Sequence, residues 1–396
     1  MVRSKTSVVL ALTIWLLPMQ ASGQAPAPEL MLTKALQQSP YQFDRVLRAI
    51  ALPGGRIGIF DDVATSIVVS DSALRTFASI GRIGEGPGEY SAPMQIYEVH
   101  DGGIYIQDRI GPKLLRYSLD GRSSGIVEFP NAASCAVAAR RYLFTTRAID
   151  SSGHLYVLDD PARIHPNGRV TVADSAAIVR WVSPCRRDTL AFVPNPHGSD
   201  AEVSPNGRVM ARIGASSPPF APRWVWAVSR DGAVATIDPA TYRIRVRTAS
   251  GQVRTVHGIQ GERIAVSEAH KREWLEAADN APVLVVGRSQ AGPPSARMQS
   301  NVGGTPEPDR WPTHLPPFLE GAASFDLEGR LWVRRTGAAS APLRYDVFDT
   351  TLRQVAVVRL DALGKRIVGF GDGRVFVATR GPDDVERLEV FSDPLP

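Results

Sequence analysis

GGRIGIFDDVATSIVVSDSALRTFASIG, from Gly54 to Gly81, alternates turn residues with short β-rich runs. The run Arg56–Phe60 follows a Gly turn, is rich in β-branched and aromatic residues, and ends at a pair of Asp residues before a second such run. Runs of this composition bounded by turn residues are typical of β-strands. The segment therefore predicts a β-hairpin.

The same unit recurs along the chain and sets the architecture. Further copies occupy residues 101–121, 140–159, 186–207 and 230–251, and two more begin at residues 328 and 372. Gly55 and Gly103 are about 45 residues apart, as are Gly329 and Gly373, and a period in the forties is typical of four-stranded propeller blades. Seven hairpins predict an all-β propeller of six or seven four-stranded blades.

The composition fits a globular chain and excludes some classes of partner. Of the 396 residues, 43% are hydrophobic and 21% are charged. The 34 Gly and 31 Pro are distributed along the chain, as expected for residues in many turns. The net charge of +5 is small and no Lys/Arg block is present. We therefore expect no nucleic acid as a partner.

The first residues have the order of an export signal. Arg3 and Lys5 precede the apolar run Val8–Leu17, and small residues follow up to Gly23. We predict a signal peptide over residues 1–23, cut after Gly23, and a single propeller domain over 24–396 in the periplasm or outside the cell. No membrane span is expected after cleavage, because the apolar run is too short to cross a bilayer as a stable helix. A retained anchor is the alternative.

The two cysteines, Cys135 and Cys185, leave three interpretations open. An exported pair can form a structural disulfide, which is the first interpretation. Two unpaired buried thiols, or redox or metal chemistry, are the others, although a zinc site needs four ligands.

An insertion over residues 263–316 interrupts the repeats. Ser267–Asp279 predicts a short helix, because it holds good helix formers without Gly or Pro, and Gly287–Pro317 is polar and Pro-rich. Such an insertion is a lid or ligand loop, or a passive loop. His270 and Trp274 lie four residues apart on the predicted helix, so they share a face that docks the helix or binds a ligand.

GRIGEGPGEY, at residues 81–90, resembles a loop of the six-bladed β-propeller family of exported bacterial proteins, which are similar to NHL-repeat propellers. The resemblance extends to EGRLWVRR at 328–335, to RYDVFD at 344–349 and to GDGRVFVATRGPDDVERLEVF at 371–391. It implies a ring with a central channel, closed by an N-terminal strand that completes the last blade, for which Glu29–Leu36 is the candidate. It implies no particular activity.

The charged residues of that loop are candidate ligand-binding residues. Arg82, Glu85 and Glu89 can form a charged patch at one mouth of the channel. The alternative is an inter-blade turn held together by Arg–Glu contacts, with Gly residues that permit an irregular backbone path.

Acidic residues at strand ends are the remaining candidates for chemistry. Converging carboxylates can bind Ca²⁺, but Asp at a strand end also accepts backbone N–H bonds in Asx-type turns. The residues concerned are Asp61, Asp62, Asp108, Asp159, Asp160 and Asp238. GRSSG at 121–125 matches the sequence pattern of a nucleophile elbow. That motif needs a turn from a strand to a helix, whereas this segment lies between two expected strands.

These patterns favour an exported, non-catalytic binding module, expected to be a monomer without a cofactor. Its partner would be a protein, or a small-molecule or glycan ligand. The alternative is a Ca²⁺-dependent propeller hydrolase of the lactonase or esterase type, and a structural partner in a cell-envelope complex is a third possibility. Fold alone does not choose among them, since propellers host unrelated functions.

Overall fold

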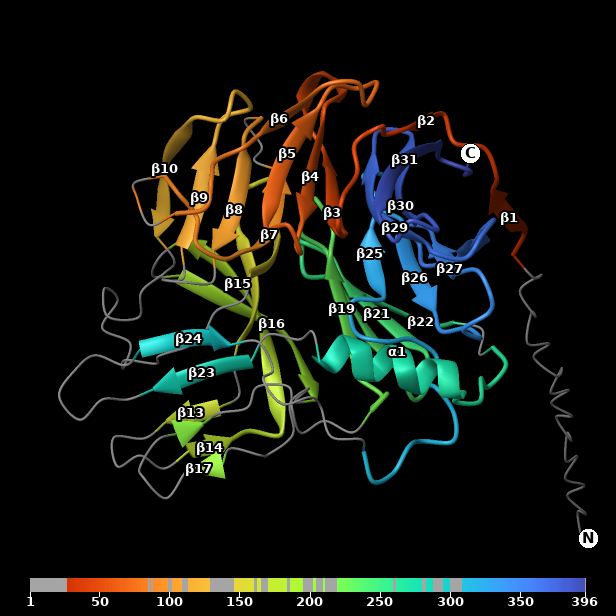
Figure 1. Ribbon diagram of the computed structural model, residues 1–396. Helices are drawn as coiled ribbons and strands as arrows, with labels where there is room; N and C mark the ends of the chain where they lie inside the picture. Colours follow the sequence, from red (N-terminus) through yellow and green to blue (C-terminus); the bar gives the residue numbers. More distant parts are fainter. Residues whose placement is uncertain are drawn as a thin grey trace, which may run out of the picture.

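A computed structural model shows the chain as a ring of β-sheets (Figure 1). The description covers residues 27–84, 86, 88–98, 102–108, 113–128, 146–159, 162–164, 170–183, 186–194, 202–203, 209–210, 219–258, 261–279, 283–287, 295–299 and 308–395. Within these ranges, no helix has both the length and the apolar character needed to span a membrane.

The ring contains six blades, each built from four antiparallel strands, and one further strand is added to blade 5. Blade 1 consists of β3 (Val46–Ala51), β4 (Ile57–Asp61), β5 (Ser66–Ser70) and β6 (Phe77–Ser79). Blade 2 consists of β7 (Pro93–Glu98), β8 (Ile104–Asp108), β9 (Lys113–Tyr117) and β10 (Ser123–Glu128). Blade 3 consists of β11 (Thr146–Ile149), β12 (Leu155–Asp159), β15 (Ser175–Ser183) and β16 (Arg186–Pro194).

The second half of the ring repeats this order. Blade 4 consists of β19 (Val225–Val228), β20 (Val234–Asp238), β21 (Arg243–Arg247) and β22 (Val253–His257). Blade 5 consists of β25 (Ala323–Phe325), β26 (Leu331–Arg335), β27 (Arg344–Phe348) and β28 (Gln354–Leu360). Blade 6 consists of β29 (Lys365–Gly371), β30 (Arg374–Arg380), β31 (Glu386–Ser392) and β2 (Gln37–Gln38).

The structure has six blades, whereas the sequence repeats predicted six or seven. The hairpin units at 140–159 and 186–207 contribute to a single sheet, because β12 pairs with β15 and β15 pairs with β16. The connection between β12 and β15 is long and carries its own small strand pair. That length makes one blade look like two repeats in the sequence.

The first strand of each blade lies on the inside of the ring. These inner strands are β3, β7, β11, β19, β25 and β29, and contacts between neighbours run from β29 through β3, β7, β11 and β19 to β25. The approach at the seam between blades 6 and 1 is tight. A Cβ atom at Gly369 would lie 1.8 Å from the backbone oxygen of Ala49, so this position of β29 has no room for a side chain.

The N-terminal segment closes the ring, but the prediction for Glu29–Leu36 was wrong in its details. Only β2 completes the last blade, where Gln37 and Gln38 pair antiparallel with β31. β1 (Glu29–Leu32) instead pairs in parallel with β28 and becomes a fifth strand of blade 5. Leu32 is buried there, among apolar residues of blades 5 and 6. The segment therefore clamps two neighbouring blades.

The hydrophobic core lies between the blades, and both faces of each sheet are buried. All five residues of β4 are buried. Ile57 and Ile59 pack against Phe376 of blade 6, whereas Phe60 packs against Ile104 of blade 2. Successive side chains of a strand point to opposite faces, so a strand covered on both sides reads as a continuous apolar run.

The insertions carry small elements of their own. The predicted helix is confirmed by α1 (Glu268–Asp279), where the Ser267 hydroxyl accepts from the backbone N–H of His270 at 3.4 Å. The segment Gly287–Pro317, expected to be a Pro-rich loop, contains β24 (Ser295–Gln299), which pairs with β23 (Val283–Gly287) directly before it. The other small pairs are β13 (Ala162–Ile164) with β14 (Val170–Val172), and β17 (Glu202–Val203) with β18 (Val209–Met210).

All of these insertions lie on one face of the ring (Figure 1). They occur after β16 and β22, where the chain returns to the start of the next inner strand, and between β12 and β15. In an antiparallel four-stranded blade these connections share one face. The turns between first and second strands emerge on the opposite face and are short, as at the 3-10 turn Pro53–Gly55. The connections that vary therefore gather where inner strands begin.

Candidate functional site

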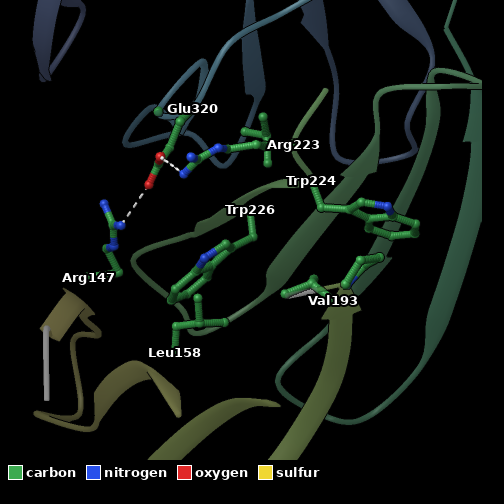
Figure 2. Close-up of a pocket in the computed structure, with 10 residues that line it drawn as sticks. Arg147, Leu158, Val193, Arg223, Trp224, Trp226 and Glu320 are labelled. Carbon is green, nitrogen blue, oxygen red and sulfur yellow. Dashed lines mark hydrogen bonds and ion pairs between the residues drawn. The ribbon is translucent and has the colours of Figure 1, made fainter. Parts of the chain in front are cut away.

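A pocket opens on the insertion face, where the inner strands of blades 3 and 4 begin (Figure 2). Its cavity volume is about 50 Å³. The residues that line it are Arg147, Leu158, Val193, Pro194, Arg223, Trp224, Val225, Trp226, Glu320 and Gly321. We call it the Trp–Arg pocket.

Three charged side chains from three blades form its rim. Glu320, in the segment that leads into β25, accepts a hydrogen bond at each carboxylate oxygen. Oε1 accepts from Nη2 of Arg147 at 2.9 Å, and Oε2 accepts from Nη1 of Arg223 at 3.1 Å. Arg147 lies on β11, and Arg223 precedes β19. Two guanidinium groups and one carboxylate leave these three residues with a net positive charge.

Two tryptophans and two aliphatic side chains form the apolar part of the pocket. Trp224 and Trp226 are two residues apart at the beginning of β19, so they share a face of the strand. Val193 of β16 and Leu158 of β12 lie beside them (Figure 2). Both indoles are only partly buried. The pocket thus offers ring faces for stacking next to hydrogen-bond donors for an acidic or hydroxyl group.

Charged residues of the GRIGEGPGEY loop interact with other residues of the same loop. Nε of Arg82 donates to Oε1 of Glu89 at 2.5 Å, and the N–H of Gly86 donates to Oε2 at 2.8 Å. The Gly86 hydrogen bond, followed by Arg82, holds the pKa of Glu89 below its usual range. A Cβ at Gly84 would lie 1.9 Å from Oε2 of Glu89, so the carboxylate folds over a position without a side chain. Glu85 lies outside the described residues.

His270 and Trp274 hold the helix on the propeller. His270 is buried, and its Nδ1 accepts from the backbone N–H of Ser267 at 3.1 Å. Nε2 then carries the proton and faces the carbonyl oxygen of Gly337 at 3.2 Å. Trp274 meets Trp311 edge to face, with ring centroids 5.5 Å apart. Both candidates therefore contact other parts of the chain, and they do not line the Trp–Arg pocket.

The acidic residues at strand ends bind backbone N–H groups. Asp61 accepts from Asp44 at 2.7 Å and from Arg45 at 3.1 Å, just before β3. Asp108 does the same before β7, where it accepts from Ser91 at 2.8 Å and Ala92 at 2.9 Å. These two carboxylates thus fix the chain as it enters an inner strand.

The other acidic candidates have separate surroundings. Asp62 pairs with Arg45, with Nη2 and Oδ2 2.5 Å apart. Asp238 accepts from the N–H of Ala240 at 2.9 Å, in the turn after β20. Asp159 lies 3.2 Å from Arg187, and Asp160 lies outside the described residues.

A different acidic cluster does form, at the edge between blades 5 and 6. Asp326, Glu328 and Asp393 bring one oxygen each within 4.8 Å of one another. Arg330 lies among them, with Nε 2.6 Å from Asp326, Nη2 3.2 Å from Glu328 and a further ion pair to Asp393. All three carboxylates of this cluster therefore pair with one guanidinium.

Other sequence predictions fall outside the described residues. These are the signal peptide over residues 1–23, and Cys135 and Cys185. The signal cleavage and the disulfide stay predictions.

Sequence reasoning missed every residue of the Trp–Arg pocket. The usable signal was RWVW at residues 223–226, where an Arg precedes two Trp that share a strand face. Arg147 and Glu320 gave no such signal, because they are 173 residues apart and meet only through the ring.

Comparisons with known proteins agree with the fold. Residues 45–164 match the family model described as a 6-bladed beta-propeller. No curated protein matches the chain. A putative exported protein from Bacteroides fragilis is similar in structure, with a TM-score of 0.45, 10% identity, and coverage of 92% of this chain and 98% of that one.

Two further solved structures are similar at the same low level of identity. The calcium-binding protein regucalcin from Agrobacterium tumefaciens has a TM-score of 0.40 and 11% identity, over 94% of this chain and 99% of its own. A gluconolactonase from Xanthomonas campestris has a TM-score of 0.38 and 11% identity, over 88% of each chain. The sheet order identifies this chain as a six-bladed β-propeller, and residues 45–164 are similar to a family model of the same fold.

Proposed function

We propose that this propeller is a non-catalytic binding module that takes a small organic ligand in the Trp–Arg pocket. The observation that carries the proposal is the placement of two partly exposed indoles beside two guanidinium groups that share one carboxylate. Long connections on one face of a rigid scaffold are the usual position of a binding site. The pocket lies on that face.

The chemistry of the pocket favours a ligand with an apolar ring face and an acidic substituent. A sugar or aromatic ring can stack on an indole, while an acidic group can bind the guanidinium groups in the forked geometry that suits arginine. Arg147 and Glu320 are each about half exposed, at 48% and 47%. Exposed ion pairs of this kind contribute about 0–1 kcal/mol, so a ligand can replace them at little cost.

No specific observation among the described residues favours the calcium-dependent hydrolase. Asp61 and Asp108 already bind backbone N–H groups, and the cluster of Asp326, Glu328 and Asp393 surrounds Arg330. A calcium site needs six to eight oxygen ligands around one point. We therefore retain binding as the proposed function and place it in the periplasm or outside the cell, in accordance with the predicted signal peptide.

Tryptophan fluorescence tests the proposal directly. The probes are glucuronate and phenylacetate, with glucose and benzyl alcohol as their uncharged counterparts. We expect an acidic ring compound to change the emission saturably, and Trp226→Ala to weaken that binding at least tenfold.

Trp181→Ala is the matched control, because Trp181 is also partly buried and belongs to blade 3 but lies near the other end of its strand, beside Arg187. Equal affinity in the Trp226 and Trp181 variants would contradict the proposal. So would a linear, unsaturable response to all four probes.

A further inference from the structure

A second feature lies on the inside of the ring, at Arg48. This residue belongs to β3, the inner strand of blade 1. Its guanidinium carbon lies 5.7 Å from the ring centroid of Tyr97, a residue of β7 in blade 2. Arginine over an aromatic face is an attractive contact. The contact also shows where the charged end of the Arg48 side chain lies.

The two sides of β7 show where the Arg48 side chain runs. Ile96 packs in the cluster between blades 1 and 2, whereas Tyr97 packs with Leu155 in the cluster towards blade 3. The Tyr97 hydroxyl donates to the backbone oxygen of Thr146 in blade 3, at 2.5 Å. Arg48 comes from blade 1 and yet reaches the ring of Tyr97. It must therefore pass the inner edge of β7, which faces the axis of the propeller.

No described residue neutralises the charge of Arg48. Across the residues that the structure describes, Arg48 makes no ion pair and no side-chain hydrogen bond, and its guanidinium lies against the π-face of Tyr97. Burial lowers its pKa, partly offset by Tyr97. A guanidinium has five N–H donors and stays charged in proteins. Arg48 is partly buried, so water solvates its charge only in part, and without a counter-ion among the described residues this position attracts an anion.

The neighbouring inner strand increases the positive field. Arg147 follows Thr146 on β11, and the charges of Arg48 and Arg147 both act on the phenol of Tyr97. Arg147 shares its partner Glu320 with Arg223. Arg147 and Arg223 thus keep an excess of one positive charge over Glu320. Clefts lined by one sign of charge concentrate counter-ions.

We propose that Arg48 anchors an oxyanion-binding site at the axis of the propeller. The ligand group is a carboxylate or a phosphate, since both match the fork of a guanidinium. The site is centred on Arg48 and Tyr97, neither of which lines the Trp–Arg pocket, whereas Arg147 contributes to the positive charge of both. Substitution of Arg48 therefore tests this site apart from the binding module proposed above.

Calorimetric titration with sodium phosphate and with sodium acetate tests the site, at constant ionic strength set with sodium chloride. We expect saturable binding of at least one of the two, and the two titrations separate phosphate from carboxylate. Arg48→Gln should weaken this binding at least tenfold, and Arg48→Lys should weaken it less because the charge is kept. Arg122→Gln is the control, because Arg122 is 87% exposed and pairs with Asp120.

Spectra of the wild-type chain keep the result interpretable. If Arg48→Gln fails to fold, the ¹⁵N–¹H signals of the arginine Nε groups in the wild-type chain should show one responsive arginine during the phosphate titration. Absence of saturable binding by both anions would overturn the proposal, and so would equal affinity in Arg48→Gln and wild type.

Discussion

Glu386 joins the last blade to the first, and its removal should weaken the ring at that seam. The side chain is 1% exposed. Oε1 accepts from Nη1 of Arg366 at 2.7 Å, and Oε2 accepts from Nη2 of Arg366 and from the backbone N–H of Val46, both at 2.8 Å. Arg380 approaches Oε1 at 3.1 Å. One carboxylate therefore links two arginines of blade 6 to the first residue of β3.

The substitution Glu386→Gln keeps the size of the side chain but removes its charge. Breaking a buried ion pair by removing one partner costs about 3–5 kcal/mol. Arg366 and Arg380 are 26% and 40% exposed, so water takes up part of their charge. We therefore expect a lower loss, of about 2–3 kcal/mol in the free energy of unfolding. For a chain of this size that corresponds to roughly 3–4 °C in the unfolding temperature.

The pH dependence gives a second readout of the same interaction. Burial favours protonation of Glu386, but the hydrogen bonds and charge of Arg366, the N–H of Val46 and the charge of Arg380 outweigh it and hold the pKa below its usual range. A carboxyl whose pKa is lower in the folded state contributes stability above its unfolded pKa of about 4.3, and loses it as pH falls through the folded value. Wild type should therefore lose stability below about pH 4 more steeply than Glu386→Gln.

Urea unfolding followed by tryptophan fluorescence, between pH 3 and 7, measures both effects. Asp384→Asn is the matched control, because Asp384 also pairs with Arg380 but is 86% exposed, and it should change stability by less than about 0.5 kcal/mol. Equal free energies of unfolding for the two variants at pH 7 would show that the seam does not depend on this carboxylate. The same conclusion would follow if Glu386→Gln lost stability below about pH 4 as steeply as wild type.

Three further predictions concern the ring and its acidic cluster. Gly369→Ala should destabilise the chain by about 3 kcal/mol or more in thermal unfolding, because the new Cβ meets the backbone of Ala49. The control Gly337→Ala has open space and should be about as stable as wild type. Similar stabilities of the two variants would contradict the tight contact at the seam. Removal of residues 27–38, which include β1 and β2, should lower the unfolding temperature by several degrees in calorimetry, and an unchanged transition would show that the clamp on blades 5 and 6 is dispensable. Unfolding temperatures in Ca²⁺ and in chelator should coincide because Arg330 fills the acidic cluster, and a calcium-dependent rise would count against that role.

The sequence predicted the blades well because each one is local. A hairpin such as β4–β5 needs only a turn and two β-rich runs, and these lie within a few residues of each other. β2 could not be found in this way. It is two glutamines long and is defined by its pairing with Val390 and Glu389, at the far end of the chain.

The candidate site was harder to predict for the same reason. Arg82 and Glu89 were visible because seven residues separate them, and they do pair. The rim of the Trp–Arg pocket joins Arg147, Arg223 and Glu320 from three blades, and no local pattern marks such residues as neighbours. Arg48 was equally hidden, because one arginine on a strand gives no sign that its charge faces the axis.

The closing strand also bears on how the chain folds during synthesis. β2 is among the first strands that a ribosome makes and β31 is the last, and the hydrogen bond between Gln38 and Glu389 spans 351 residues. At roughly 5–20 residues per second, β2 waits about 20–70 s for its partner. Until then, the early blades expose a sheet face that only blade 6 can cover. Completion of the ring is thus a late event, and the nascent chain depends on protection of that face until its last strand is made.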